Sequence, residues 1–340
     1  MSPRAWIAFG GVATLWGIPY LFIKVSDDGG IPPVFLAWSR LTLAAGVLLA
    51  LSKRAGVLGP LRGRLRWLVI YAALEMAIPF PLIATGEQRI ASSLAAILIA
   101  TVPLIIALLA LRFDPTERVN GRRLAGLAVG LAGVVALVGI DVAGRPSELI
   151  GAAMVLLAAV GYAAGPMIFN RKLADLDPRA AMGAALALAA IVLTPAAALD
   201  PPQARPSAGA LMAVVVLGLF CTAAAFVLFA GLVSEIGPGR AAVITYIAPI
   251  VAVALGVTVL GESIGAGAVA GLLLILAGSW ISTDGRLPPG VAAVSSRVSR
   301  RRRRRPGAPA SGLRPPLEHS MPGRPDAPGA SASASGYERG

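Results

Sequence analysis

Long apolar runs separated by short polar breaks make up the chain as far as about residue 282. Ten of these runs approach the length of about 20 residues that a helix needs to cross a bilayer. They cover residues 5–23, 32–51, 67–84, 90–111, 122–140, 149–169, 180–199, 208–232, 238–260 and 264–282. They show no strand periodicity and are too long and continuous for the strands of a membrane barrel. The pattern predicts an all-α integral membrane protein with ten transmembrane helices.

The first run has a rival interpretation, because an apolar stretch behind Arg4 is also typical of a secretory signal peptide. The run contains Trp16 and Pro19, and it reaches Lys24 without a cleavage site of the A-x-A type. A first membrane span is therefore the better interpretation.

Composition supports a membrane protein and narrows the chemistry. Charged residues make up only 14% of the chain, whereas a soluble domain carries about 25%. The single cysteine, Cys221, excludes an intrachain disulfide and a multi-cysteine metal site. The only histidine, His319, follows the last run, which excludes the usual zinc and histidine-based hydrolase sites within the spans. We therefore expect no cofactor and no metal site.

Positive charge is unevenly divided between the two ends of the predicted helices. The loops on the side of the N-terminus carry fourteen lysines and arginines, without the segment after residue 283, whereas the loops of the other side carry four. Because Lys and Arg concentrate in cytoplasmic loops, we expect both termini to be cytoplasmic. The membrane is the inner, cytoplasmic one if the cell is bacterial.

The second half of the chain repeats the first at an offset of 146 residues, which becomes 145 after one residue is lost. The matching positions share residue type and order: Ile90 and Ile236, Pro103 and Pro249, Glu117 and Glu262, Gly126 and Gly271, Gly133 and Gly278. We expect two five-helix repeats, residues 1–141 and 142–283. Five is odd, so the second copy enters the membrane inverted, which is typical of transporters with alternating access.

Several stretches resemble the EamA type of the drug/metabolite transporter superfamily over roughly residues 5–282. They are TLWGIPYLFIK (14–24), RLTLAAGVLLA (40–50), ASSLAAILIATVPLIIALLA (91–110), GRAAVITYIAPIVAVALGVTVLGE (239–262) and GLLLILAGSWI (271–281). The first copy departs from the pattern, with RFDPTE (112–117) in place of the LGE at 260–262. The resemblance implies export of amino acids or other small metabolites, often driven by the proton gradient. It also implies that the fifth and tenth helices pack together.

The predicted function is a secondary transporter that moves a small, amino-acid-like metabolite outward by alternating access. An uptake permease, a multidrug efflux protein and a non-transporting receptor are the alternatives. An intramembrane enzyme would need paired aspartates, a Ser-His pair or a metal site, whereas the span cores hold one glutamate and one arginine, so we expect no enzyme. The expected partners are the substrate, the lipid bilayer and a coupling proton. We expect no nucleic acid, and the oligomeric state stays open.

Those two charges, Arg40 and Glu75, are the first candidates for the substrate pathway or for coupling. A charge at a helix centre costs about 2.5–3.5 kcal/mol, and a facing cavity or an ion pair would offset that cost. A direct pair between Arg40 and Glu75 is one interpretation, and a snorkelling Arg40 is another. At the repeat offset they align with Leu186 and Cys221, so neither charge is required to build the five-helix unit.

The remaining candidates are uncharged, and each has a structural alternative. Pro103 and Pro249 interrupt helices where a cavity could form, with Thr101 and Tyr246 beside them, or they are packing kinks. Aromatic residues of the first and sixth helices line the pathway or face lipid: Trp16, Tyr20 and Tyr162. Glu117 and Glu262 precede helices and are expected to act as caps rather than as chemical groups.

The segment 284–340 is rich in Pro, Gly, Ser and Ala, and it cannot build a core. Its run Arg300–Arg305 lacks interleaved aromatic residues for base stacking. We interpret this segment as a disordered cytoplasmic tail that lies against anionic headgroups.

Overall fold

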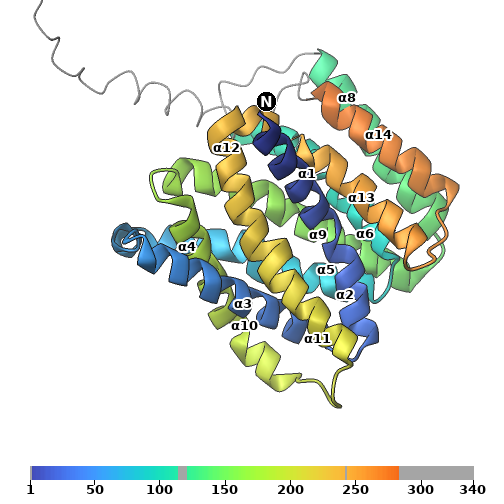
Figure 1. Ribbon diagram of the computed structural model, residues 1–340. Coiled ribbons are helices and arrows are strands. Elements are labelled where there is room, and N and C mark those ends of the chain that lie inside the picture. Colours follow the sequence, from blue (N-terminus) through green and yellow to red (C-terminus); the bar gives the residue numbers. More distant parts are fainter. Residues whose placement is uncertain (1, 114–120, 242, 283–340) are drawn as a thin grey trace, which may run out of the picture.

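The structure, a computed structural model, describes residues 2–113, 121–241 and 243–282, and these ranges contain helices and no strand (Figure 1). Glu117, Arg300–Arg305 and the whole segment 284–340 lie outside them. The α-helices are α1 (Pro3–Gly17), α2 (Pro19–Asp28), α3 (Pro33–Arg54), α4 (Leu65–Ala72), α5 (Pro79–Glu87), α6 (Ser92–Ile99), α7 (Val102–Phe113), α8 (Gly121–Leu137), α9 (Pro146–Ile168), α10 (Pro178–Leu199), α11 (Ala208–Val215), α12 (Ala225–Ala241), α13 (Ile244–Thr258) and α14 (Ala266–Ser282). A 3-10 helix, η1 (Gly59–Arg64), and four π-helices, η2 (Ala73–Ala77), η3 (Val138–Val142), η4 (Phe169–Leu173) and η5 (Val216–Ala224), join some of them.

Eight helical stretches of the described ranges are long and apolar enough to cross a membrane, by length and composition. They are Pro3–Asp28, Pro33–Arg54, Leu61–Glu87, Ser92–Ala110, Gly121–Val142, Pro146–Leu173, Pro178–Leu199 and Ala208–Gly237. The first eight predicted windows fall on these stretches. The last two fall on the shorter apolar helices α13 and α14.

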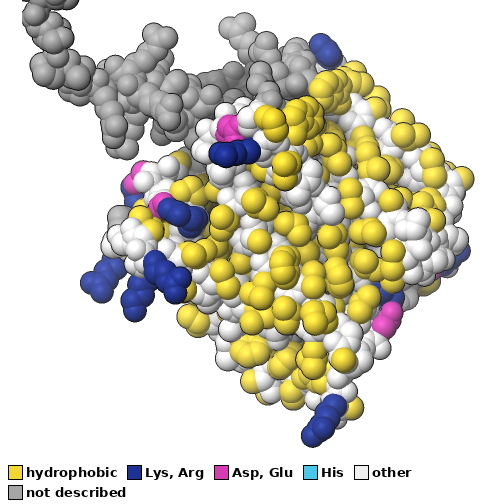
Figure 2. All heavy atoms as spheres, viewed as in Figure 1, with side chains coloured by type: hydrophobic (Ala, Val, Ile, Leu, Met, Phe, Trp, Pro, Cys, Tyr) yellow, Lys and Arg dark blue, Asp and Glu magenta, His cyan; other side chains and the backbone are white. Residues whose placement is uncertain are grey.

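The outer surface of the helices is apolar, as lipid contact requires. Leu131, Val135 and Leu273 are 55%, 70% and 64% exposed. Figure 2 shows hydrophobic side chains over most of the viewed face, with Lys and Arg side chains toward its margins. A soluble monomer rarely exposes so large an apolar surface, whereas a bilayer solvates it.

Prolines set many of the helix starts. Six helices begin with proline, where the missing N–H costs nothing and the fixed φ suits the first turn. They are α1, α2, α3, α5, α9 and α10. Side-chain oxygens of Ser2, Asp177 and Ser207 also accept hydrogen bonds from the first free amides of α1, α10 and α11.

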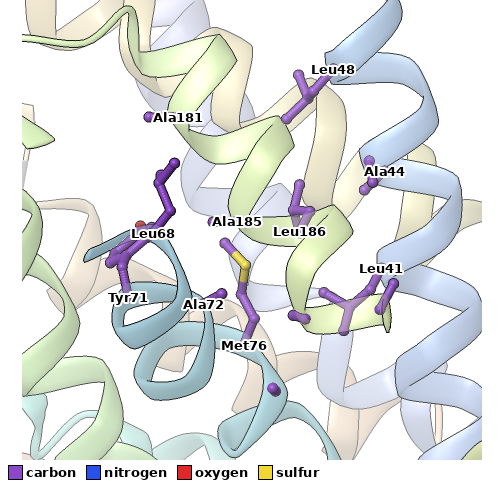
Figure 3. Close-up of a cluster of buried hydrophobic side chains, with 14 of the residues drawn as sticks. Leu41, Ala44, Leu48, Leu68, Tyr71, Ala72, Met76, Ala181, Ala185 and Leu186 are labelled. Atoms are coloured by element: carbon purple, nitrogen blue, oxygen red, sulfur yellow. The ribbon is translucent and has the colours of Figure 1, made fainter. Parts of the chain in front are cut away.

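One core cluster joins α3, α4 and α10 (Figure 3). Leu41, Ala44 and Leu48 of α3 face Ala185 and Leu186 of α10, and all five are buried. Because lipid supplies no hydrophobic drive between helices, close van der Waals packing must hold them. The alanines allow this close approach.

The second close contact joins α8 and α14, which lie side by side at one edge of the bundle (Figure 1). A Cβ added at Gly133 would lie 2.9 Å from the carbonyl oxygen of Gly271, and one added at Gly278 would overlap the backbone of Gly130. Only glycine permits these approaches. The packing of the fifth helix on the tenth, which the resemblance implied, is thus confirmed.

The helices before and after residue 143 pack on each other in matching pairs. The first helix, α1, contacts α12 and α13, and the sixth, α9, contacts α5 and both α6 and α7. The second helix, α3, contacts η5, whereas the seventh, α10, contacts α4 and η2. Each of these contacts therefore has a counterpart with the roles of the halves exchanged.

Candidate functional site

Arg40 of α3 is held by two contacts that leave part of its guanidinium open. Its Nε donates a hydrogen bond of 2.8 Å to Oγ1 of Thr222, and its Cζ lies 4.3 Å from the ring centroid of Phe80. Nη1 and Nη2 make no hydrogen bond to a described residue, and neither is buried. The half-buried side chain is thus fixed in place while both outer nitrogens stay available.

A π-helix places the acceptor for Arg40. Thr222 lies in η5, is fully buried, and donates from Oγ1 to the carbonyl oxygen of Leu217, five residues earlier, at 2.8 Å. This second bond orients the hydroxyl so that a lone pair faces Arg40. π-Helical turns are rare and occur frequently at functional sites.

Two of the predicted pathway residues lie around Arg40. Tyr20 of α2 and Tyr162 of α9 are close enough to interact with it electrostatically, as are Cys221 and Glu87. The ring of Tyr162 packs edge-on against Phe80, with the centroids 6.5 Å apart. The structure therefore gathers Arg40, Tyr20 and Tyr162 from three helices.

Glu75 does not pair with Arg40, so the interpretation as a direct ion pair is wrong. Glu75 lies in η2, and its buried Oε2 has no hydrogen-bond partner. A Cβ added at Gly165 would overlap this carboxylate, so the glycine makes room for it. Tyr162 interacts electrostatically with both Glu75 and Arg40 and thus lies within reach of the two opposite charges.

Glu87 is a buried acid that the sequence analysis missed. It is the last residue of α5, is only 1% exposed, and has no hydrogen-bond partner on either carboxylate oxygen. The third predicted span ends at residue 84 and the fourth begins at residue 90, so Glu87 falls between them. In the structure this third helical stretch continues to Glu87. It passes through the π-helix η2 and the proline that begins α5.

Glu262 acts as a helix cap, but not for the helix that follows it. Its carboxylate accepts hydrogen bonds from the backbone N–H of Ser92 (2.7 Å), from Oγ of Ser92 (2.9 Å) and from the N–H of Ser93 (2.9 Å), at the start of α6. Burial alone would raise the pKa of Glu262, but the bonds from Ser93 and Ser92 outweigh it and lower the pKa. The cap of α14 is Asp141, which accepts from the N–H of Ala268 at 2.5 Å.

The two predicted hinge prolines have different surroundings. Pro103 follows a break at residues 100–101 and lies in the first turn of α7, whereas Pro249 lies inside α13. Thr101 is buried at the break and donates to the carbonyl of Leu98 at 2.6 Å. Tyr246 packs edge-on against Trp280, with the centroids 6.2 Å apart.

Trp16 joins an aromatic cluster with Phe226 and Phe229 of α12, at centroid distances of 5.9 and 4.8 Å. It therefore connects α1 to α12 and packs against the core cluster that contains Val12 and Leu232. Within the described ranges, no three His, Cys, Asp or Glu side chains come together as a metal ion would need. The side chains present can bind an anion at Arg40 and a proton or a cation at Glu75 and Glu87.

The structure thus combines a bundle of apolar helices with a half-buried arginine held in place by Thr222 and Phe80. The sequence pattern of the EamA-like transporter family matches residues 4–139 and, a second time, residues 149–283. The chain belongs to this family, as the resemblance in its sequence indicated.

Several relatives carry transporter names. The uncharacterized inner membrane transporter YedA of Escherichia coli (strain K12) is 32% identical over 259 residues, 74% of this chain and 81% of the relative. A probable amino-acid metabolite efflux pump of Salmonella typhimurium (strain LT2) is 26% identical over 81% of this chain and 93% of its own. A probable terminal-alkyne amino-acid exporter of Streptantibioticus cattleyicolor is 35% identical over 47% of this chain and 52% of its own.

One solved crystal structure of a protein shares the fold, with a TM-score of 0.58 over 83% of this chain and 97% of the other. The two are 22% identical, so the likeness concerns the fold alone. Together with the apolar helices, the family membership makes this chain a multi-pass membrane transporter.

Proposed function

We propose that the protein is a secondary transporter that exports small amino-acid-like metabolites across the cytoplasmic membrane by alternating access. The observation that carries the proposal is the half-open guanidinium of Arg40. A guanidinium presents parallel N–H groups that match a carboxylate in a bidentate pair. Thr222 and Phe80 hold the group at one edge and one face, so little side-chain freedom is lost when a substrate carboxylate binds.

A second charge supports a zwitterionic substrate. Glu75 has an unpartnered carboxylate oxygen, and Tyr162 interacts electrostatically with both Glu75 and Arg40. An ammonium group near Glu75 and a carboxylate at Arg40 would neutralise both charges at once. Intramembrane charges are costly and mark substrate pathways, so a zwitterion gives both residues a reason to be present.

Ten spans in two inverted five-helix repeats form the framework of this proposal. The two matches of the family pattern, the exchanged helix contacts and the offset of 146 residues all support it. The distribution of Lys and Arg supports cytoplasmic N- and C-termini. In this scheme the break before Pro103 and the proline inside α13, Pro249, act as hinges of the pathway, with Thr101 and Tyr246 beside them. Trp16 and Tyr20 line it on the first helix.

The proposed direction rests on the relatives. Two of them are named as an efflux pump and as an exporter for amino-acid compounds. An uptake permease would move the same class of compound inward, and a multidrug efflux protein would not need a fixed carboxylate site. Arg40 therefore favours the metabolite exporter over the multidrug protein.

The test is flux in proteoliposomes loaded with a radiolabelled mixture of L-amino acids, followed by efflux from preloaded cells for direction. We expect Arg40→Gln to abolish flux and Arg40→Lys to restore only part of it. Arg145→Gln is the matched control, since Arg145 forms a surface pair with Glu148 at 3.0 Å and should transport like the wild type. Full flux in Arg40→Gln would overturn the proposal.

A second arm tests the zwitterion. Because a hydrogen bond to a charged group is worth about 1.5–3 kcal/mol, Glu75→Gln should raise the KM for amino acids by roughly tenfold or more. The same variant should change little for the corresponding carboxylic acids without the amino group. Equal effects on both classes would contradict a role for Glu75 in binding ammonium.

A further inference from the structure

Glu87 has the most unusual environment of the acidic residues that the structure describes. Its side chain is 1% exposed, and neither carboxylate oxygen has a hydrogen-bond partner. A buried ionised carboxylate without partners is very costly. Glu75 has one such oxygen, but the residue as a whole is half-buried, whereas Glu87 is enclosed on all sides.

The electrostatic surroundings of Glu87 also disfavour a negative charge. Glu87 ends α5, where the helix dipole is already negative. The charged groups close enough to act on it are Glu262 of the α13–α14 loop, Lys24 and Asp27 of α2, and Arg40 of α3; Tyr20 of α2 is the nearby tyrosine.

The two positive groups in this set already have partners. Lys24 is 3.3 Å from Asp28, and Arg40 is held by Thr222 and Phe80. Asp27 accepts a 2.7 Å bond from Nε2 of Gln88, next to Glu87, and adds a further negative charge. Neither of these cations binds the carboxylate directly, because both Glu87 oxygens are without a hydrogen-bond partner among the described residues, so the neutral carboxylic acid is the form that fits.

The contact between Glu262 and α6 lies next to this acid in the chain and in space. Only residues 88–91 separate Glu87 from Ser92, whose N–H and Oγ bind Glu262. If α6 moves away from the α13–α14 loop, the short segment 88–91 must move with it, and water can then reach Glu87. The charge distribution assigns this end of the bundle to the outside of the cell.

We propose that Glu87 is a proton-binding site that takes up a proton from outside water when this end of the bundle is open and holds it once Glu262 caps α6. The step is a simple protonation: the carboxylate gains one proton from water before this end closes. This inference rests on the proposed function, because alternating access supplies the opening. Later release of this proton toward the cytoplasm would couple export of substrate to the inward proton gradient, and Glu75 would remain free for substrate.

A direct test needs no substrate. The infrared C=O band of protonated carboxyl groups is measured on purified protein at neutral pH, for the wild type, Glu87→Gln and the control Glu148→Gln. Glu148 is an acid with an arginine partner, so its replacement should leave the band unchanged. We expect Glu87→Gln to lose part of the band. An unchanged band in this near-isosteric variant would overturn the inference, whether or not the protein transports amino acids.

A transport test addresses the coupling. In proteoliposomes with radiolabelled L-amino acids, Glu87→Gln should retain exchange of labelled for unlabelled substrate and lose the stimulation of flux by a pH gradient. If the variant instead keeps the stimulation and binds amino acids more weakly, Glu87 contacts substrate and is not the proton site. Absence of flux in the wild type would contradict the proposed function, and the infrared result would still decide the protonation of Glu87.

Discussion

The π-helices η2 and η5 occupy matching places in the two halves of the chain but carry different chemistry. The offset of 146 residues aligns Glu75 of η2 with Cys221 of η5. In η5 the neighbouring Thr222 is fully buried and binds Arg40, which comes from the other half. In η2 the buried oxygen of Glu75 has no hydrogen-bond partner. The two halves thus share a backbone irregularity and differ in the charge beside it.

The shared π-helix belongs to the fold, whereas the difference in charge fits the zwitterionic substrate that we propose. A π-turn widens a helix and exposes backbone or side-chain groups that an α-helix would hide. Both halves have a π-turn at the equivalent position of the sequence repeat. A symmetrical pair of glutamates or of arginines would suit a substrate with one kind of charge. One arginine and one glutamate instead suit a molecule with two different ends.

Among the changes that test the comparison of η2 and η5, the largest effect is expected from removing the hydroxyl of Thr222 in η5. Thr222→Val keeps the shape of the side chain but leaves Nε of Arg40 without its acceptor, at a cost of about 1.5–3 kcal/mol. We expect the KM for amino acids to rise by roughly tenfold to a hundredfold in proteoliposome flux. Thr222 acts through Arg40 and is a positioning residue.

Thr222→Ser is the matched control, because it retains the hydroxyl and should restore most of the affinity. The comparison of the two halves fails if Thr222→Val transports like the wild type. It also fails if Thr222→Ser is as damaged as Thr222→Val, because packing of the methyl group would then explain the effect.

A smaller effect is expected from crowding the carboxylate in η2. A Cβ at Gly165 would lie 3.1 Å from Cδ of Glu75 and closer still to Oε2. Overpacking of this kind costs typically about 1–3 kcal/mol, so Gly165→Ala should lower the thermal unfolding temperature in detergent. Gly231→Ala is the control, since a Cβ there meets nothing within 4 Å.

The double variant Gly165→Ala/Glu75→Ala decides whether the carboxylate is the cause. If it is, removal of Glu75 should recover most of the lost stability. A double variant that is no more stable than Gly165→Ala would show that the glycine serves another contact.

Much of the fold could be predicted from the sequence because a membrane span leaves a strong and simple signal. Apolar length located the eight stretches long enough to cross a membrane and the two shorter apolar helices α13 and α14, and the repeated glycines pointed to the contact between α8 and α14. The helix breaks were harder. Pro103 marked a break only approximately, because the break itself lies at residues 100–101.

The candidate site was harder to predict from the sequence, because it depends on contacts between segments that are far apart in the chain. Arg40 and Glu75 stood out as charges in apolar runs, but neighbouring antiparallel helices suggested a pair that does not form. Nothing in the sequence marked Thr222 and Phe80 as contacts of Arg40, because threonine and phenylalanine are common in membrane spans. Glu87 lies between the predicted spans 67–84 and 90–111, whereas in the structure it is the last residue of α5.

The smallest expected effect compares the caps of the two halves. At the offset of 146, Pro238 and Gly239 stand where α6 has Ser92 and Ser93. Proline lacks an N–H, and neither residue has a hydroxyl, so the sequence offers Glu117 fewer donors than Glu262 has. Loss of a cap costs about 1 kcal/mol, and Glu262→Gln should therefore lower the unfolding temperature more than Glu117→Gln does.

The pH dependence separates the cap from general packing. Because the pKa of Glu262 is lowered in the folded protein, its contribution is complete above the ordinary pKa of a glutamate and is lost as the pH falls through the lowered value. Acidification should thus destabilise the wild type and Glu117→Gln more than Glu262→Gln, measured by thermal unfolding in detergent. Parallel acid curves for all three proteins would mean that the hydrogen bonds to Ser92 and Ser93 do not stabilise the charged form. The number of hydrogen-bond donors around each glutamate would then not explain any difference in stability between Glu262→Gln and Glu117→Gln.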